Sequence, residues 1–244
     1  MRCQPNDGHQ VYIWLENVQI CLLCDEPSGT PTNLCLGCES DLPWLLDQCD
    51  RCALPLPMSG LTCAQCTRHS PAFNEVVAPW LYDFPVDTLI TRFKHSGKWP
   101  LGRLLAELLT QSLQHRFDEG LQKPELLIPV PLAKKRMRQR GYNQAAMLAQ
   151  WLGASLRISV DEHSVRRTKE TPAQQGLKAR ARKRNLRDAF TLTSPARIIG
   201  KHIALIDDVM TTGATADTLA RLLTDAGAQT VDVYCLARTA KPGE

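Results

Sequence analysis

The chain has 244 residues, of which 43% are hydrophobic and 22% charged, and its formal net charge is +4. This composition is ordinary for a soluble globular protein of one or two domains, and the charge is too mild to indicate a partner by itself. No apolar run approaches the ~20 residues that a membrane helix needs. The first residues also lack the basic and apolar pattern of a secretory leader, so we expect a cytoplasmic protein without membrane insertion.

Residues 1–20 follow no recognisable pattern and are left as an unassigned N-terminal extension. Eight of the ten cysteines then form four C-x-x-C pairs, which are Cys21 and Cys24, Cys35 and Cys38, Cys49 and Cys52, and Cys63 and Cys66. Two such pairs brought together place four thiolates in a tetrahedron, as in closed structural zinc sites. Residues 21–38 and 49–66 repeat each other in length and spacing, which predicts a double zinc ribbon over residues 21–70 with two structural zinc ions.

The spacing leaves the pairing of these sites open, since they could be sequential or interleaved. We favour the sequential arrangement because the two halves match and their connections are short. A disulfide framework, a redox C-x-x-C and rubredoxin-like iron are the competing interpretations; a reducing compartment disfavours the first, and redox chemistry rarely uses four pairs. Each ribbon is expected to be too small for a core of its own, so metal binding would supply most of its folding free energy, on the order of 10 kcal/mol.

Beyond residue 70, short apolar runs alternate with helical patterns, which predicts a parallel α/β sheet. We expect strands at residues 76–84, 126–131, 203–206 and 231–237. We expect helices after Asp87 and at residues 101–113, 145–152 and 214–226. Pro79 favours an edge position for the first strand. Cys235, in the last strand, is expected to be a buried structural thiol.

Two basic segments interrupt this alternation. Residues 132–140 follow the second strand, and we expect them to form a loop rich in lysine and arginine. Residues 166–187 have no clear apolar period and predict a mobile cationic loop. Local basic patches point to polyanions, either the phosphates of a small ligand or a nucleic acid. A solvated cationic face is the alternative for residues 134–140, because basic heptamers are common.

Residues 203–215, IALIDDVMTTGAT, are the most informative stretch of the chain. Asp207 and Asp208 are expected at the carboxyl end of a buried strand, where open α/β sheets bind ligands. The residues that follow supply hydroxyls and unpaired amides at a helix start, which favours an anion; they are Thr211, Thr212, Gly213, Ala214 and Thr215. Carboxylates accept hydrogen bonds from hydroxyls, so the stretch suits a sugar diol beside a phosphate. A buried strand that ends in an ordinary Asp-Asp turn is the alternative.

This stretch resembles the signature for 5-phosphoribosyl-1-pyrophosphate (PRPP) of the type I phosphoribosyltransferases. The match has no gap, and every polar position of the signature agrees. The resemblance implies that Asp207 and Asp208 hold the ribose hydroxyls and that residues 211–215 hold the 5′-phosphate, with Mg²⁺ bridging ligand oxygens. It implies a second loop for the pyrophosphate, for which the candidates are Lys134, Arg136 and Arg140, and a flexible hood at residues 167–190. The expected fold class is α/β, a type I phosphoribosyltransferase-like parallel sheet with helices on both faces over residues 71–244, preceded by the zinc ribbons.

The whole chain resembles the ComF family, and within it the GntX type, which is linked to the use of DNA as a nutrient. The features are the double ribbon, PVPL…RGYNQ at residues 129–144, the IDDVMTTGAT stretch, and a spaced run of Arg167, Thr171, Gln174, Arg182, Asn185, Ala189 and Phe190. Tyr142 departs from the family, which often has phenylalanine there. The resemblance implies a role in DNA uptake or utilisation, and it leaves the reaction open because some proteins of this fold bind PRPP only as a regulator.

Three functions compete on these grounds. The first is a PRPP-binding enzyme or a phosphoribosyltransferase. The sequence does not identify the acceptor of a transfer reaction. The second is a single-stranded-DNA-binding module, with bases stacked on Trp44, Phe73 or Trp80. The third is a scaffold whose ribbons dock a competence protein. We prefer the first, and the first two can coexist.

Overall fold

The computed structural model describes residues 19–168 and 189–240. By their contacts, the residues form two compact units, residues 1–40 and 41–244. The described part of the first unit contains the short helix α1 (Leu36–Ser40). The second unit contains the second half of the cysteine array together with the whole sheet. The sequence-based division at residue 70 therefore stays a prediction.

The main sheet of the second unit is parallel, as predicted, with the strand order β1–β8–β7–β3–β4. Its strands are β1 (Val76–Val77), β2 (Trp80–Leu81), β3 (Leu126–Pro129), β4 (Ser159–Val160), β7 (His202–Met210) and β8 (Thr230–Arg238). The predicted strand at residues 76–84 is in fact two short strands, β1 and β2, which both pair with β8 at one edge. Pro79 lies between them, where it has no amide hydrogen to give to the ladder.

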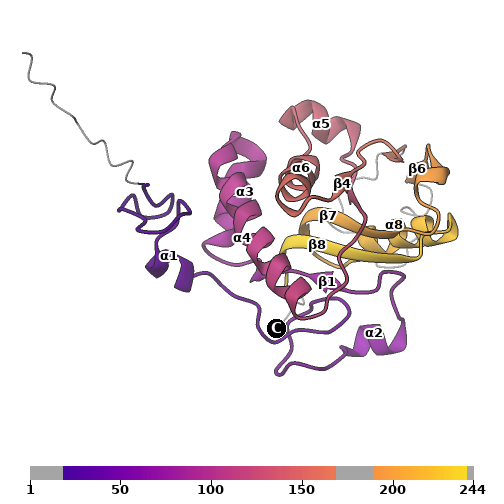
Figure 1. The fold of residues 1–244 in the computed structure, drawn as a ribbon, viewed down its shortest axis with the longest axis horizontal. Helices are drawn as coiled ribbons and strands as arrows, with labels where there is room; N and C mark the ends of the chain where they lie inside the picture. Colours follow the sequence, from indigo (N-terminus) through magenta and orange to yellow (C-terminus); the bar gives the residue numbers. More distant parts are fainter. Residues whose placement is uncertain (1–18, 169–188, 241–244) are drawn as a thin grey trace, which may run out of the picture. The chain divides into compact units, whose positions relative to one another are not determined.

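Helices cover both faces of this sheet. Leu219 of α8 packs into one core cluster with Ile203 and Leu205 of β7. Because successive strand residues face opposite sides, α6, whose Gly153 lies against Leu127 of β3, covers the other face. Figure 1 shows α3 and α4 beside α6. The helices are α3 (Val86–Ser96), α4 (Trp99–Asp118), α6 (Gln144–Leu156) and α8 (Ala214–Asp225). Among the described residues, none of the helices combines the length and the apolar character needed to cross a bilayer.

The basic segment after β3 is helical, so the predicted loop at residues 132–140 is wrong. It forms α5 (Lys134–Arg140), none of whose residues is buried. Lysine, arginine, methionine and glutamine are all good helix formers, and this local preference decides the structure where no apolar stripe exists. Gly141 ends the helix with φ 79°, in the left-handed region that glycine adopts without strain.

A small antiparallel pair joins the ends of the predicted hood. β5 (Val165–Arg167) pairs with β6 (Phe190–Leu192). The predicted mobile loop between these strands, with Thr171, Gln174, Arg182 and Asn185, lies outside the described residues. A 3₁₀ turn, η1 (Pro195–Arg197), then leads towards β7.

The second ribbon shares the core of the sheet. Its four cysteines belong to the same hydrophobic cluster as β7 and α8, and it carries the short helix α2 (Ala64–Arg68). The amide of Leu45 donates to the carbonyl of Pro79 (2.8 Å), and the amide of Leu81 donates to the carbonyl of Pro43 (2.8 Å). The second ribbon therefore uses the core of the sheet, a packing contribution that the sequence did not predict.

Candidate functional site

The two aspartates lie inside a strand. β7 runs on to Met210, beyond the predicted end at residue 206, because β8 is equally long and pairs with it to the end. Asp207 and Asp208 are therefore held in register near the carboxyl edge of the sheet, and both are partly buried. A strand fixes their backbone more firmly than the alternative, an ordinary Asp-Asp turn, would.

A cavity of about 380 Å³ opens at this edge. Six of the predicted site residues line it together, which are Asp207, Asp208, Thr211, Thr215, Arg136 and Arg140. Arg136 and Arg140 both face the cavity because α5 is a helix, and residues four apart lie on the same face of a helix. The cavity thus brings a carboxylate pair, two hydroxyls and two guanidinium groups to one place.

The other predicted ligand contacts lie elsewhere. Lys134 is exposed, at the first position of α5, and is not among the residues that line this cavity. Thr212, Gly213 and Ala214 line a second cavity, of about 450 Å³. Gly213 has φ 74° and precedes α8, so a left-handed residue turns the chain between the two cavities.

The carboxylates of the site interact strongly with each other and with one lysine. Burial, and then the charge of Asp208, raise the pKa of Asp207 to about 7. The amide of Asp208 donates to Oδ1 of Asp207 (2.8 Å), and Nζ of Lys94 lies 2.9 Å from Oδ1 of Asp208. A carboxyl group whose pKa is raised in this way by burial and a neighbouring charge, at the wall of a cavity, is typical of a functional site.

Sequence reasoning missed several lining residues. Lys94 comes from α3 and meets Asp208 only through the fold, so no local spacing could reveal it. The side chain of Asn143 caps α6, because it accepts a hydrogen bond from the amide of Ala145 (3.1 Å). This role can be predicted from sequence, since Asn directly before a helical pattern is a common cap. Arg167 also lines the cavity; burial and the neighbouring Arg136 lower its pKa.

The cysteines gather sequentially, as we favoured. The sulfur atoms of each group lie within 4.8 Å of one another, and the groups are Cys21, Cys24, Cys35 and Cys38, and Cys49, Cys52, Cys63 and Cys66. Sγ of Cys24 and Cys35, and Sγ of Cys52 and Cys63, are each 3.7 Å apart. Tetrahedral zinc with Zn–S bonds of ~2.3 Å separates its sulfurs by about 3.8 Å, so both sets fit structural zinc.

The two ribbons repeat each other in backbone detail. The amide of Cys21 donates to the carbonyl of Glu26, and the amide of Cys49 to that of Leu54, both at 2.8 Å. Asp25 and Ala53 both have positive φ, 62° and 52°. Within the second site the thiols differ: burial is outweighed by amide hydrogen bonds that lower the pKa of Cys49 to about 7, whereas burial raises the pKa of Cys52 to about 11 and also raises the pKa of Cys66. Metal binding requires all four as thiolates.

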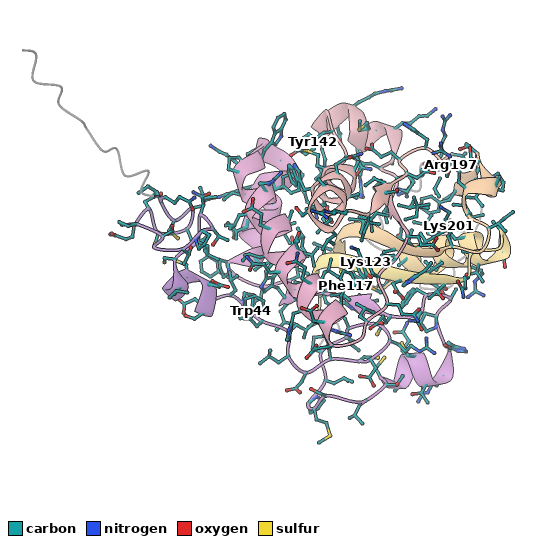
Figure 2. The ribbon with its side chains drawn as sticks, viewed as in Figure 1. Trp44, Phe117, Lys123, Tyr142, Arg197 and Lys201 are labelled. Atoms are coloured by element: carbon teal, nitrogen blue, oxygen red, sulfur yellow. The ribbon has the colours of Figure 1, made fainter. Side chains whose placement is uncertain are left out.

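Two of the aromatic residues predicted to stack on DNA are buried. Trp80 is 0% and Phe73 3% exposed, so the prediction was wrong for both, because each fills the core of the second unit. Trp44, which is labelled in Figure 2, is 36% exposed. Its ring lies 5.5 Å from that of the buried Trp80.

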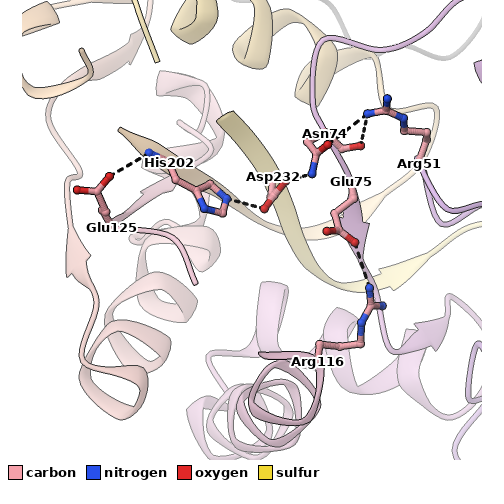
Figure 3. Close-up of polar contacts among 7 residues, drawn as sticks. All are labelled: Arg51, Asn74, Glu75, Arg116, Glu125, His202 and Asp232. Atoms are coloured by element: carbon pink, nitrogen blue, oxygen red, sulfur yellow. Dashed lines mark hydrogen bonds and ion pairs between the residues drawn. The ribbon is translucent and has the colours of Figure 1, made fainter. Parts of the chain in front are cut away.

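A separate polar network lies at the amino ends of the strands (Figure 3). His202 contacts the buried Asp232 at 2.6 Å, and Asn74 donates to the same carboxylate at 3.2 Å. Arg51 of the second ribbon donates to the carbonyl of Asn74 at 2.8 Å. The network ties ribbon and sheet together at the edge opposite the cavity, so it serves packing and not the candidate site.

Comparison with known proteins agrees with these features. The double zinc ribbon domain family matches residues 18–67. DNA utilization protein YhgH of Shigella flexneri is 37% identical over 222 residues, which is 90% of this chain and 97% of that protein. Competence protein F of Haemophilus influenzae is 36% identical over 207 residues, 84% of this chain and 90% of that protein. The adenine phosphoribosyltransferase of Thermoanaerobacter pseudethanolicus overlaps 59% of this chain and 83% of its own at 16% identity and a TM-score of 0.37, from which we argue nothing further.

Proposed function

Because the chain belongs to the ComF family of DNA utilization and competence proteins, we propose that it serves DNA uptake or utilisation through a PRPP-binding, phosphoribosyltransferase-like site. One observation carries the proposal, the convergence of Asp207, Asp208, Thr211, Arg136 and Arg140 on one cavity. These groups match the parts of PRPP, which are a diol, a 5′-phosphate and a pyrophosphate.

Each part of the ligand has a physical partner in this arrangement. The carboxylates of Asp207 and Asp208 accept hydrogen bonds from the ribose hydroxyls, and Lys94 keeps Asp208 in position. In the phosphate loop, residues 211–215, Thr211 and Thr215 offer their hydroxyls to the 5′-phosphate from the wall of this cavity, and the unpaired amides at the start of α8 favour the same anion. Arg136 and Arg140 offer guanidinium forks to the pyrophosphate. Mg²⁺, which prefers oxygen ligands and phosphates, would bridge the pyrophosphate and the diol.

The proposal is for PRPP binding, and a transfer reaction would need an acceptor that no described residue identifies. A family member that only binds PRPP would use the same contacts. The thiolate ligands of both four-cysteine sites need a reducing compartment, so a cytoplasmic location belongs to the proposal.

Calorimetric titration of the full chain with PRPP and Mg²⁺ tests it. We expect binding heat from the wild type and none from the double variant Asp207→Asn/Asp208→Asn. Glu107→Gln is the matched control, because it removes an exposed carboxylate of α4 that pairs only with Arg103 at 3.0 Å among the described residues. An absence of heat from the wild type, or equal heat from the double variant, contradicts the proposal.

Contact with single-stranded DNA is the second candidate. The exposed cations of α5 that do not line the cavity, among them Lys134 and Arg138, support it, as do the names of the relatives. Neutralised phosphates release counterions, so binding measured by fluorescence anisotropy should weaken steeply with salt. Lys134→Ala/Arg138→Ala should lower the log–log salt slope by about 1.4, at about 0.7 per phosphate contact. A flat salt profile contradicts this candidate. No surface within the described residues favours the scaffold interpretation.

A further inference from the structure

Arg238 occupies an unusual place at the end of β8. It is 5% exposed and pairs across the sheet with Met210, the residue before the phosphate loop. Its Nε donates to the carbonyl of Cys52 at 2.9 Å, and Cys52 is a ligand of the second four-cysteine site. Its Nη1 donates to the carbonyls of Met210 (3.1 Å), Thr211, and Thr239 (2.8 Å). One side chain therefore holds both the second metal site and the first residue of the phosphate loop.

The charge of Arg238 is also unusual. Within residues 19–168 and 189–240, no carboxylate forms an ion pair with it. A buried cation with carbonyl partners alone is costly unless a negative charge lies near. Four thiolates around one divalent zinc carry a net charge of about −2. A metal-loaded second site would therefore place a negative charge beside Arg238, which contacts the carbonyl of Cys52.

The ribbon and the start of α8 belong to one hydrophobic cluster, but a cavity lies beside this packing. The cavity of about 450 Å³ lies between Cys66 of the ribbon and Ala214 at the start of α8, with Arg238 in its wall. A second bridge reaches the other end of the loop: the amide of Ala72 donates to Asp217 in the first turn of α8 (2.8 Å), and the amide of Asp217 donates to the carbonyl of Gly213 (2.8 Å). Among the side chains that the structure describes, Arg238 is the one that donates both to Cys52 of the metal site and to the carbonyls of Met210 and Thr211.

We propose that Arg238 is a positioning residue that couples the second four-cysteine site to the phosphate loop. With metal bound at that site, Arg238 fixes the carbonyls of Met210 and Thr211 and so orders the amides of residues 211–215. This inference rests on the proposed function, because the ordered amides are those offered to the 5′-phosphate. The second ribbon would then set the affinity for a phosphorylated ribose without touching it.

The test compares Arg238→Met with Arg51→Ala in the full, zinc-loaded chain. Methionine keeps the length of the side chain but has no donor, whereas Arg51 links the same ribbon to the sheet at the opposite edge, through the carbonyl of Asn74. Zinc content, hydrogen exchange of the amides of residues 211–215, and PRPP affinity are measured for each variant. For Arg238→Met we expect unchanged zinc content, faster hydrogen exchange of the loop amides, and an affinity for PRPP about tenfold weaker. A tenfold loss is the size expected when hydrogen bonds from a charged group are removed.

Arg51→Ala should leave the hydrogen exchange of the loop amides and the affinity for PRPP as in the wild type. Unchanged loop exchange and affinity in a folded, zinc-loaded Arg238→Met protein would overturn the coupling. If the wild type binds no PRPP, the proposed function fails, while loop exchange still decides the role of Arg238.

A second measurement applies if Arg238→Met does not fold. Cys24→Ser removes a ligand of the first site, so that a chelator then acts on the second site alone. We expect the amides of residues 211–215 to lose protection as that metal is removed, before the amides of residues 203–206 in β7. Loss of protection in both segments together, or in neither, would overturn the coupling.

Discussion

Replacing Asp207 by asparagine should stabilise the protein at alkaline pH while it abolishes PRPP binding. The pKa of Asp207 rises from 3.8 to about 7 in the folded protein, chiefly because of burial and then because of the charge of Asp208. The stability that this group contributes is complete below pH 3.8 and is lost as the pH rises through 7. Above pH 7 the folded protein therefore carries a poorly solvated carboxylate, and Asp207→Asn removes it.

The size of the effect follows from the shift. Three pH units correspond to about 4 kcal/mol as an upper limit, because each unit is worth about 1.4 kcal/mol. Asp207 is only partly buried, and solvent screening reduces the energy. We expect a gain of about 2 kcal/mol in the free energy of unfolding at pH 8, which is about 5 °C in melting temperature for a unit of this size.

Thermal unfolding of the wild type and of Asp207→Asn at pH 5 and pH 8 measures this gain. The variant should melt higher at pH 8, and its advantage should shrink at pH 5, where the wild-type carboxyl is protonated in the folded protein. Glu107→Gln, the exposed control, should show no such pH dependence. A variant that is less stable than the wild type at pH 8, or an advantage equal at both pH values, would refute the reasoning.

Other perturbations have equally specific outcomes. Lys94→Ala removes the partner of Asp208 and should move the pH midpoint of PRPP binding upward, so calorimetry should show a greater loss at pH 6.5 than at pH 8.5. Elemental analysis should find two zinc ions per chain. Cys49→Ser should lower the melting temperature of the sheet, because Cys49 lies in its core, whereas Cys24→Ser should leave it unchanged. Gly213→Ala should cost about 1–2 kcal/mol in urea unfolding, because φ is 74° and the added methyl would also displace the end of the Met210 side chain.

The order of the α/β elements could be predicted from sequence because the signals are local. The apolar runs of β3, β7 and β8 and the helical stripes of α4 and α8 each appear within a short window. The cysteine ligands could be predicted for the same reason, since C-x-x-C spacing is set by the knuckle itself. The aspartate pair and the phosphate loop also lie in one continuous stretch.

The parts that sequence did not predict depend on the assembled fold. Lys94 reaches Asp208 from another helix, and Arg238 reaches Cys52 from the other end of the chain. The burial of Phe73 and Trp80 depends on how the second ribbon packs on the sheet. The helix α5 was missed for a different reason, because its residues favour a helix individually but show no apolar period.

The shared core of the second ribbon has a practical consequence for dividing the gene. A polypeptide that starts at residue 71 would leave the sheet with an uncovered apolar surface where Leu45, Cys52 and Cys66 pack, and we expect it to aggregate. One that starts at residue 41 keeps that surface covered and should be the smallest soluble fragment. The two copies of the cysteine repeat therefore differ in role. We expect the sheet to stay folded when the first copy is deleted and to lose its cover when the second is deleted.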